Sequence, residues 1–273
     1  MIAAPVRLFT VRLFILLLGS ATLAAAAPPS ALASALEYLR DQKSYSWVVI
    51  NSDPGPVAQQ FRTRRGTVTT VQQSTSPNMK GQVDSNGNML IQREWADGLR
   101  LDTIITRDGT MVTKTPEGWL TDREILTAQA EERLRGRGPT VRYLWLRRAD
   151  RPDIRRPDQE LVPFLQGNAE FEALADSYVT KIRSRAGDPA KPNEDDNEPG
   201  TNVTVTMNLH GGMIRDYEVK IEGTRRATRA RISVPVTEQR IVILTYVPVR
   251  GIDIPYEARA KLEAQPTAAA QAR

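Results

Sequence analysis

Cysteine is absent from this chain of 273 residues, and histidine occurs once, at His210. Without these ligands, a zinc site or a Cys–His nucleophile pair cannot be assembled in the usual way. A Ser-His-Asp triad would depend on His210, whose place beside Gly211-Gly212 is typical of an exposed turn residue. No phosphate-binding loop or dinucleotide fingerprint occurs. We therefore expect a non-enzymatic protein that holds no metal and no cofactor.

Long apolar runs are also lacking, except at the start of the chain. There, Arg7 and Arg12 precede LFILLLGSATLAAAA, which ends in small residues that fit a signal-peptidase site. The run is shorter than the roughly 20 residues that span a bilayer. We predict a signal peptide over residues 1–26 and a periplasmic or secreted mature protein. Because no cysteine is available for acylation, we expect no lipid anchor.

Charge of one sign does not dominate the chain. It has 37 Lys and Arg against 32 Asp and Glu. The predicted signal peptide removes two of the arginines. This near balance makes nucleic acid a poor partner. Arginines gather at 62–65, 146–156 and 224–231, and such clusters usually form solvated faces. The alternative for 224–231 is peripheral contact with anionic lipid headgroups, which arginine recognises well.

Helical spacing is visible first in PPSALASALEYLRDQ, for which we predict an amphipathic helix with Ser30 as its N-cap. Its apolar positions are Leu32, Leu36 and Leu39. Alternation follows in SYSWVVI, which places Tyr45, Trp47 and Val49 on one face of a strand. GTVTTV at 66–71 also favours extended chain.

Turn signals recur at short intervals after these strands. They are Asn86-Gly87, Asp108-Gly109 and Pro116-Glu117-Gly118. DSNGN at 84–88 imitates half of a calcium loop, but Met89 stands where that loop requires glycine. A hairpin turn explains the pattern better. The spacing predicts an antiparallel meander.

The middle of the chain changes to helical patterns. TDRE predicts a capping box from Thr121 to Glu124, followed by a helix whose stripe is Ile125, Leu126 and Leu134. A second helical zone begins near Asp158. We predict a third helix over NAEFEALADSYVTKI, with SYVTKI as an alternative strand. The apolar residues of this third pattern are Phe171, Leu174, Ala175, Tyr178 and Ile182.

The remaining sequence returns to strands. The segment 186–200 is rich in proline and charge and predicts a mobile exposed loop. VTVTMNL at 203–209 alternates, and in the next segment Tyr217, Val219 and Ile221 alternate with charged residues. Two more strands are expected near 228–236 and 240–248, the latter buried on both faces. A short helix should follow Pro255, with a disordered tail over 264–273.

This element order, with helices at the start and in the middle and no regular strand–helix alternation, predicts an α+β antiparallel architecture. We expect a single domain over residues 27–263.

Two stretches carry a resemblance to a known superfamily. KTPEGWLT at 114–121, and GGMIRDYEVKIEG with the strands after it, resemble LolA/LolB-type lipoprotein carriers and LppX-type lipid-binding proteins. The resemblance covers most of residues 30–262. It implies a curved antiparallel sheet, an unclosed β-barrel, with helices packed on its concave face and an apolar cavity for acyl chains.

The function implied by the resemblance is binding of a hydrophobic ligand, either lipid or lipoprotein acyl chains, as a lipoprotein carrier does. Tyr217, Val219 and Ile221 would then point inward, toward the helices and the ligand. Aromatic side chains add contact area at small entropic cost. We therefore include the tryptophans in the candidate ligand site, as lining or rim: Trp47, Trp95 and Trp119.

An alternative function is an envelope regulatory or interaction module, because the fold also resembles the sensing domain of RseB-type regulators. Its partner would be another envelope protein, which a pull-down would recover in stoichiometric amount. The third hypothesis is a hydrolase. It would be supported by an activity that disappears when His210 or a pair of carboxylates is replaced.

Overall fold

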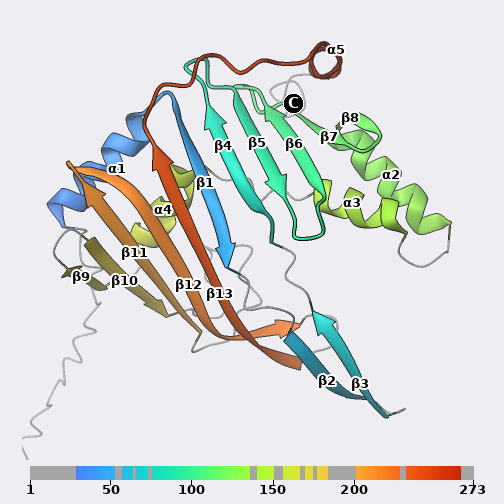
Figure 1. Ribbon diagram of the computed structural model, residues 1–273, viewed down its shortest axis with the longest axis horizontal. Coiled ribbons are helices and arrows are strands. Elements are labelled where there is room, and N and C mark those ends of the chain that lie inside the picture. Colours follow the sequence, from blue (N-terminus) through green and yellow to red (C-terminus); the bar gives the residue numbers. More distant parts are fainter. Residues whose placement is uncertain are drawn as a thin grey trace, which may run out of the picture.

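The computed structural model in Figure 1 describes most of the chain after the first 28 residues. The described residues are 29–52, 57–63, 66–72, 76–135, 140–150, 156–166, 170–174, 177–183, 201–227 and 232–265. The predicted signal peptide and the 186–200 loop lie outside them. So does the predicted tail from residue 266 on, and so do the side chains of 225–231.

Within the described ranges, eleven strands form one antiparallel sheet, in the order β8-β7-β6-β5-β4-β1-β13-β12-β11-β10-β9. The sheet is curved and does not close, because β8 and β9 remain separate edges (Figure 1). This architecture confirms the predicted α+β fold class. A separate hairpin pairs β2 with β3. The strands are β1 (Tyr45–Ser52), β2 (Val57–Thr63), β3 (Gly66–Gln72), β4 (Asn78–Val83), β5 (Met89–Glu94), β6 (Arg100–Ile105), β7 (Met111–Thr115), β8 (Gly118–Thr121), β9 (Glu170–Leu174), β10 (Ser177–Arg183), β11 (Asn202–His210), β12 (Met213–Ala227) and β13 (Ile232–Thr245).

Alternation and turn chemistry explain the meander from β4 to β8. Gly87 and Gly109 both have positive φ, near 85° and 83°, which glycine adopts without the penalty that other residues meet. The predicted turns therefore stand where the sequence placed them. In β1, Tyr45, Trp47 and Val49 are buried, as their spacing predicts.

The described residues also form five helices: α1 (Ser30–Asp41), α2 (Asp122–Leu134), α3 (Val141–Ala149), α4 (Pro157–Gln166) and α5 (Tyr256–Glu263). The predicted capping box is confirmed at α2. The Thr121 hydroxyl accepts a hydrogen bond from the Glu124 backbone N–H at 3.2 Å, and the Glu124 carboxylate accepts one from the Thr121 N–H at 2.8 Å. α5 follows Pro255 as expected.

Two details of the predicted helices are wrong. Pro29 is the N-cap of α1, and Ser30 is already its first helical residue. In α2, Ile125 is buried but Leu126 and Leu134 are exposed. The inward positions are held instead by Ala128, Gln129 and Glu132. Polar side chains are tolerated there because they find partners: the Gln129 amide donates to the Leu146 carbonyl at 3.0 Å.

The predicted third helix is also wrong, because its sequence forms β9 and β10. The alternative prediction, that SYVTKI forms a strand, is confirmed. β10 pairs along its length with β11, so the strand satisfies backbone groups on the edge of β11 that a helix would leave unpaired. Val179, Thr180 and Ile182 are β-branched, a residue type that favours extended chain. Helix α3, by contrast, was not predicted.

The expectation that 240–248 is buried on both faces is corrected by β13. Val242 and Leu244 are buried, whereas Ile243 between them is about two-fifths exposed. β13 lies between β1 and β12, and the face that carries Val242 and Leu244 packs into the main core. Its apolar run therefore behaves as an alternating strand.

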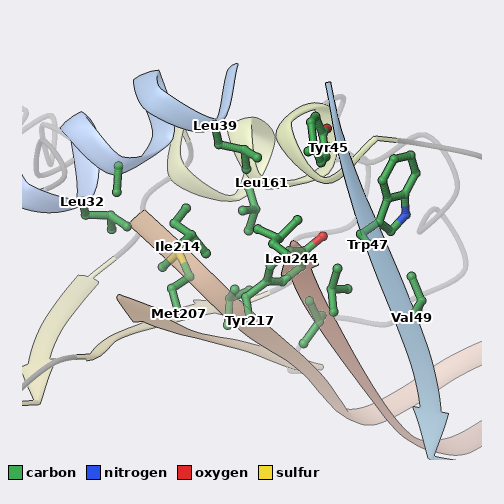
Figure 2. Close-up of a cluster of buried hydrophobic side chains, with 14 of the residues drawn as sticks. Leu32, Leu39, Tyr45, Trp47, Val49, Leu161, Met207, Ile214, Tyr217 and Leu244 are labelled. Carbon is green, nitrogen blue, oxygen red and sulfur yellow. The ribbon is translucent and has the colours of Figure 1, made fainter. Parts of the chain in front are cut away.

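Two adjacent residues of β8 show on which face of the sheet the helices lie. Leu120 packs with the cluster formed by α2 and α3, while the adjacent Trp119 packs against Ala258 of α5. Because successive strand residues point to opposite faces, α5 lies on the opposite face from α2 and α3. Helices α1 and α4 share the concave face with α2 and α3, over the main core shown in Figure 2.

Candidate hydrophobic-ligand site

The helices on the concave face form two separate pairs. α1 packs on β12 and against α4, whereas α2 and α3 pack against each other and on β7. Strands β4 and β5 lie between these two regions of the sheet (Figure 1). The strip of concave face between the helix pairs is the candidate site.

Three residues in register form the base of this strip, and we call them the floor. Trp47 of β1 pairs with Gly81 of β4, which pairs with Ile91 of β5. The Trp47 indole lies directly over Gly81, where an added Cβ would come within 2.1 Å of ring atoms Cε2 and Cζ2. Figure 2 shows Trp47 on the side of β1 away from Leu161. The floor is thus apolar, and glycine makes room for its largest side chain.

On one side of the floor, Tyr45 attaches β1 to α4. Its hydroxyl donates a 2.8 Å hydrogen bond to Asp158 Oδ1, which also accepts one from Arg156 Nε at 3.0 Å. The Arg156 guanidinium lies 5.6 Å from the Tyr45 ring centroid. Burial raises the pKa of Tyr45 far above its usual value, with a further rise from the Asp158 charge. Tyr45 therefore remains a protonated donor across the physiological range.

A second tyrosine attaches α4 to β12. The Tyr217 hydroxyl donates a 2.6 Å hydrogen bond to Glu160 Oε2, and Arg240 of β13 forms an ion pair with Oε1 of the same carboxylate. Tyr217 is fully buried, and this burial raises its pKa well above the usual value. Two hydroxyl–carboxylate bonds thus fix the first turn of α4 to the sheet.

On the other side of the floor, Arg93 of β5 attaches the sheet to α3. Its side chain is buried; Nη1 donates to the Arg148 carbonyl and Nη2 to Thr103 Oγ1, each at 3.0 Å. Burial lowers the Arg93 pKa to about 10, so the group is charged at neutral pH. Arg148 lies in the last turn of α3, where exposed carbonyls carry partial negative charge. The helix terminus therefore compensates a buried cation.

The predicted tryptophans fall into three different clusters. Trp47 belongs to the main core, and Trp95 to the cluster with α2 and α3. The guanidiniums of Arg93 and Arg148 lie 5.6 and 5.3 Å from the Trp95 ring centroid. Trp119 lies under α5 on the opposite face. The structure does not bring the three tryptophans together.

The other three predicted residues share the concave face with Trp47. Tyr217 and Val219 are buried in the main core, and Ile221 is half-buried against it. Their partners in the neighbouring strand β11 are, in the same order, Met207, Val205 and Val203.

Gly81, Ile91 and Arg93 were not among the predicted site residues. Their signal was weak: in LIQREW, Ile91 and Arg93 share a face with Trp95, but a strand arginine normally points to solvent.

Asp84 explains the calcium-like pattern in another way. Its carboxylate accepts backbone N–H bonds from Asn86 and Asn88 at 2.9 Å and from Ile252 at 3.1 Å. Burial alone would raise the Asp84 pKa, but these donors hold it below its usual value. The side chain thus fixes the C-terminal segment to the β4–β5 turn. In the described ranges, no group of three or more His, Asp or Glu is arranged to hold a metal ion.

No protein-family model matches the chain, and no curated protein sequence matches it. The helices of the described residues are all too short or too polar to cross a membrane. His210, the predicted turn residue, is exposed at the end of β11.

Proposed function

We propose that this protein binds the hydrocarbon chain of a lipid or of an acylated protein on the floor, between the two helix pairs. The observation that carries the proposal is the apolar strip of Trp47, Gly81 and Ile91, flanked by helix pairs that rest on different strands. A ligand there would lie on a continuous apolar surface without displacing a strand. The export predicted from residues 1–26 agrees with an envelope carrier of such ligands.

The energetics favour reversible binding. Each buried methylene contributes about 0.8 kcal/mol, so ten supply roughly 8 kcal/mol before ordering costs. This corresponds to about 1 μM affinity at best. A carrier that must release its ligand requires affinity of this order.

Uptake requires movement, because Trp47 and Ile91 are buried in the structure. The helix that must move to widen the strip on one side is α4, which Tyr45 and Tyr217 hold by hydrogen bonds to Asp158 and Glu160. Opening would break these defined polar contacts together with the packing of Leu161 in the main core. Such contacts can break and reform without loss of the sheet.

Quenching by a brominated fatty acid tests the site directly. Bromine quenches indole fluorescence at short range, so a chain bound on the floor should quench Trp47. The matched control is Trp119, which is also buried but lies under α5. We expect Trp47→Phe to remove the quenching and Trp119→Phe to leave it.

Organic extraction of the purified protein, followed by mass spectrometry, provides the second measurement. We expect co-purified lipid. Absence of lipid together with absence of quenching would overturn the proposal. Equal loss of quenching in the two tryptophan variants would move the site away from the floor.

A further inference from the structure

The linked end of α2 and α3 exposes apolar side chains that the rest of the fold does not use. Leu134 is 87% exposed and Val141 is 81% exposed. Leu144, one turn further along α3, is about half exposed. We call these three residues the hairpin tip. In Figure 1 this end of the hairpin lies at the margin of the molecule. Apolar residues gathered in this way commonly mark an interaction surface.

The tip is held in place by a buried carboxylate. Glu132 accepts hydrogen bonds from Thr140 Oγ1 at 2.8 Å and from Arg142 Nη1 at 3.1 Å. Arg142 also pairs with Glu117 in the β7–β8 turn, with Nε 2.6 Å from Oε1. Arg135 donates to Glu132 at 2.8 Å. Both helices and the sheet are thus joined close to the tip, so Leu134 and Val141 are presented by a rigid support.

The charge around the tip is positive. Residues 131–147 contain five arginines against two glutamates, a net charge of +3. Of the glutamates, Glu132 is turned inward and already paired. Arg133 and Arg147 are exposed, and no carboxylate of the described residues pairs with either. Exposed leucine and valine beside unneutralised arginine match the interface of an anionic bilayer, where apolar side chains enter the acyl boundary and arginines meet phosphates.

We propose that the hairpin tip docks this protein on the surface of a membrane that contains anionic phospholipid. Leu134 and Val141 enter the interface, and Arg133 and Arg147 contact headgroup phosphates. This inference is independent of ligand binding on the floor, because the tip lies beyond the α2–α3 cluster and shares no residue with the floor.

Co-sedimentation of the full chain with lipid vesicles tests the docking. The vesicles are phosphatidylcholine alone, or phosphatidylcholine mixed with phosphatidylglycerol. We expect the wild-type protein to bind the anionic vesicles, more weakly as salt rises. The variant Leu134→Ser with Val141→Ser should bind at least about tenfold more weakly, since both apolar contacts are lost. Arg133→Gln with Arg147→Gln should remove the preference for phosphatidylglycerol.

The matched control is Val247→Ser, which replaces a valine that is 68% exposed outside the hairpin. It should bind as the wild type does. All variants carry the same N-terminus, so the N-terminal segment cannot cause a difference in vesicle binding between them. Equal vesicle binding by the Leu134/Val141 variant and the wild type would overturn the proposal. Failure of the wild type to bind anionic vesicles would also overturn it and would point to a protein partner. Brominated fatty acid quenching, measured without vesicles, reports the floor separately.

Discussion

The Tyr217 hydroxyl on β12 donates a 2.6 Å hydrogen bond to the Glu160 carboxylate on α4, inside the main core. A fully buried phenol thus holds the first turn of a helix that covers the concave face. The bond couples two parts of the chain that are 57 residues apart. It gives α4 a specific attachment that packing alone would not provide.

Replacing Tyr217 with phenylalanine should loosen α4 while the apolar ring stays in place. Because the partly buried Glu160 carboxylate loses one donor, we expect the free energy of unfolding to fall by about 1–3 kcal/mol. Hydrogen exchange of the α4 amides should become faster than that of the strand amides. Urea titration and hydrogen-exchange mass spectrometry measure the two effects.

Tyr256→Phe is the matched control, because Tyr256 is exposed on α5. It should change neither measurement. If exchange of α4 is unchanged in the Tyr217 variant, the hydroxyl does not hold the helix.

The close approach of Trp47 to Gly81 makes a second prediction. Alanine at position 81 would place Cβ against the indole, so Trp47 must shift. We expect Gly81→Ala to lower the free energy of unfolding by about 1–3 kcal/mol. Gly251→Ala is the control, since a Cβ there meets open space.

A double-mutant cycle identifies the cause. Trp47→Leu removes the ring that the new methyl group would meet, so its cost should be smaller in the Gly81→Ala background than in the wild type. Strictly additive costs would show that the alanine acts on something other than the indole.

Asp84 should contribute to acid sensitivity. Its folded-state pKa is depressed, so the unfolded chain takes up the proton more readily. The stabilisation is therefore present above about pH 4 and is lost as pH falls through the folded-state pKa. We expect Asp84→Asn to cost about 1–3 kcal/mol near neutral pH and to flatten the decline in acid. Urea titrations at several pH values measure both.

Asp253→Asn removes an exposed carboxylate from the same C-terminal segment and serves as the control. It should leave the acid profile unchanged. A decline in acid that is equally steep in Asp84→Asn and in the wild type would assign the sensitivity to other groups.

Sequence patterns predicted the structure correctly where a segment's own residues determine it. Tyr45, Trp47 and Val49 alternate because one face of β1 is buried, and Thr121 with Glu124 forms a cap from side chains close in sequence. Residues 170–183 could not be assigned in this way. Their apolar spacing suits a helix, but the open edge of β11 is a tertiary feature that the segment itself does not contain.

The residues of the floor could not be predicted from sequence patterns for a related reason. No sequence motif marks Gly81. Its role is to leave room for the Trp47 ring of the neighbouring strand β1. Arg93 is a charged residue in a strand, and its burial is possible because α3 ends above it with a free carbonyl. Helix α3 was itself not predicted. The Arg148 carbonyl, which accepts the hydrogen bond from Arg93, therefore cannot be identified from the sequence around Arg93.

The position of β13 constrains the order in which this chain can fold. β1, near the start of the described chain, has β13 as its neighbour, and β13 also pairs with β12. The two halves of the sheet are thus joined by a strand that is synthesised late. Such long-range pairing slows folding. A newly made chain would therefore leave β1 without its β13 neighbour until Ile232–Thr245 had emerged late in synthesis.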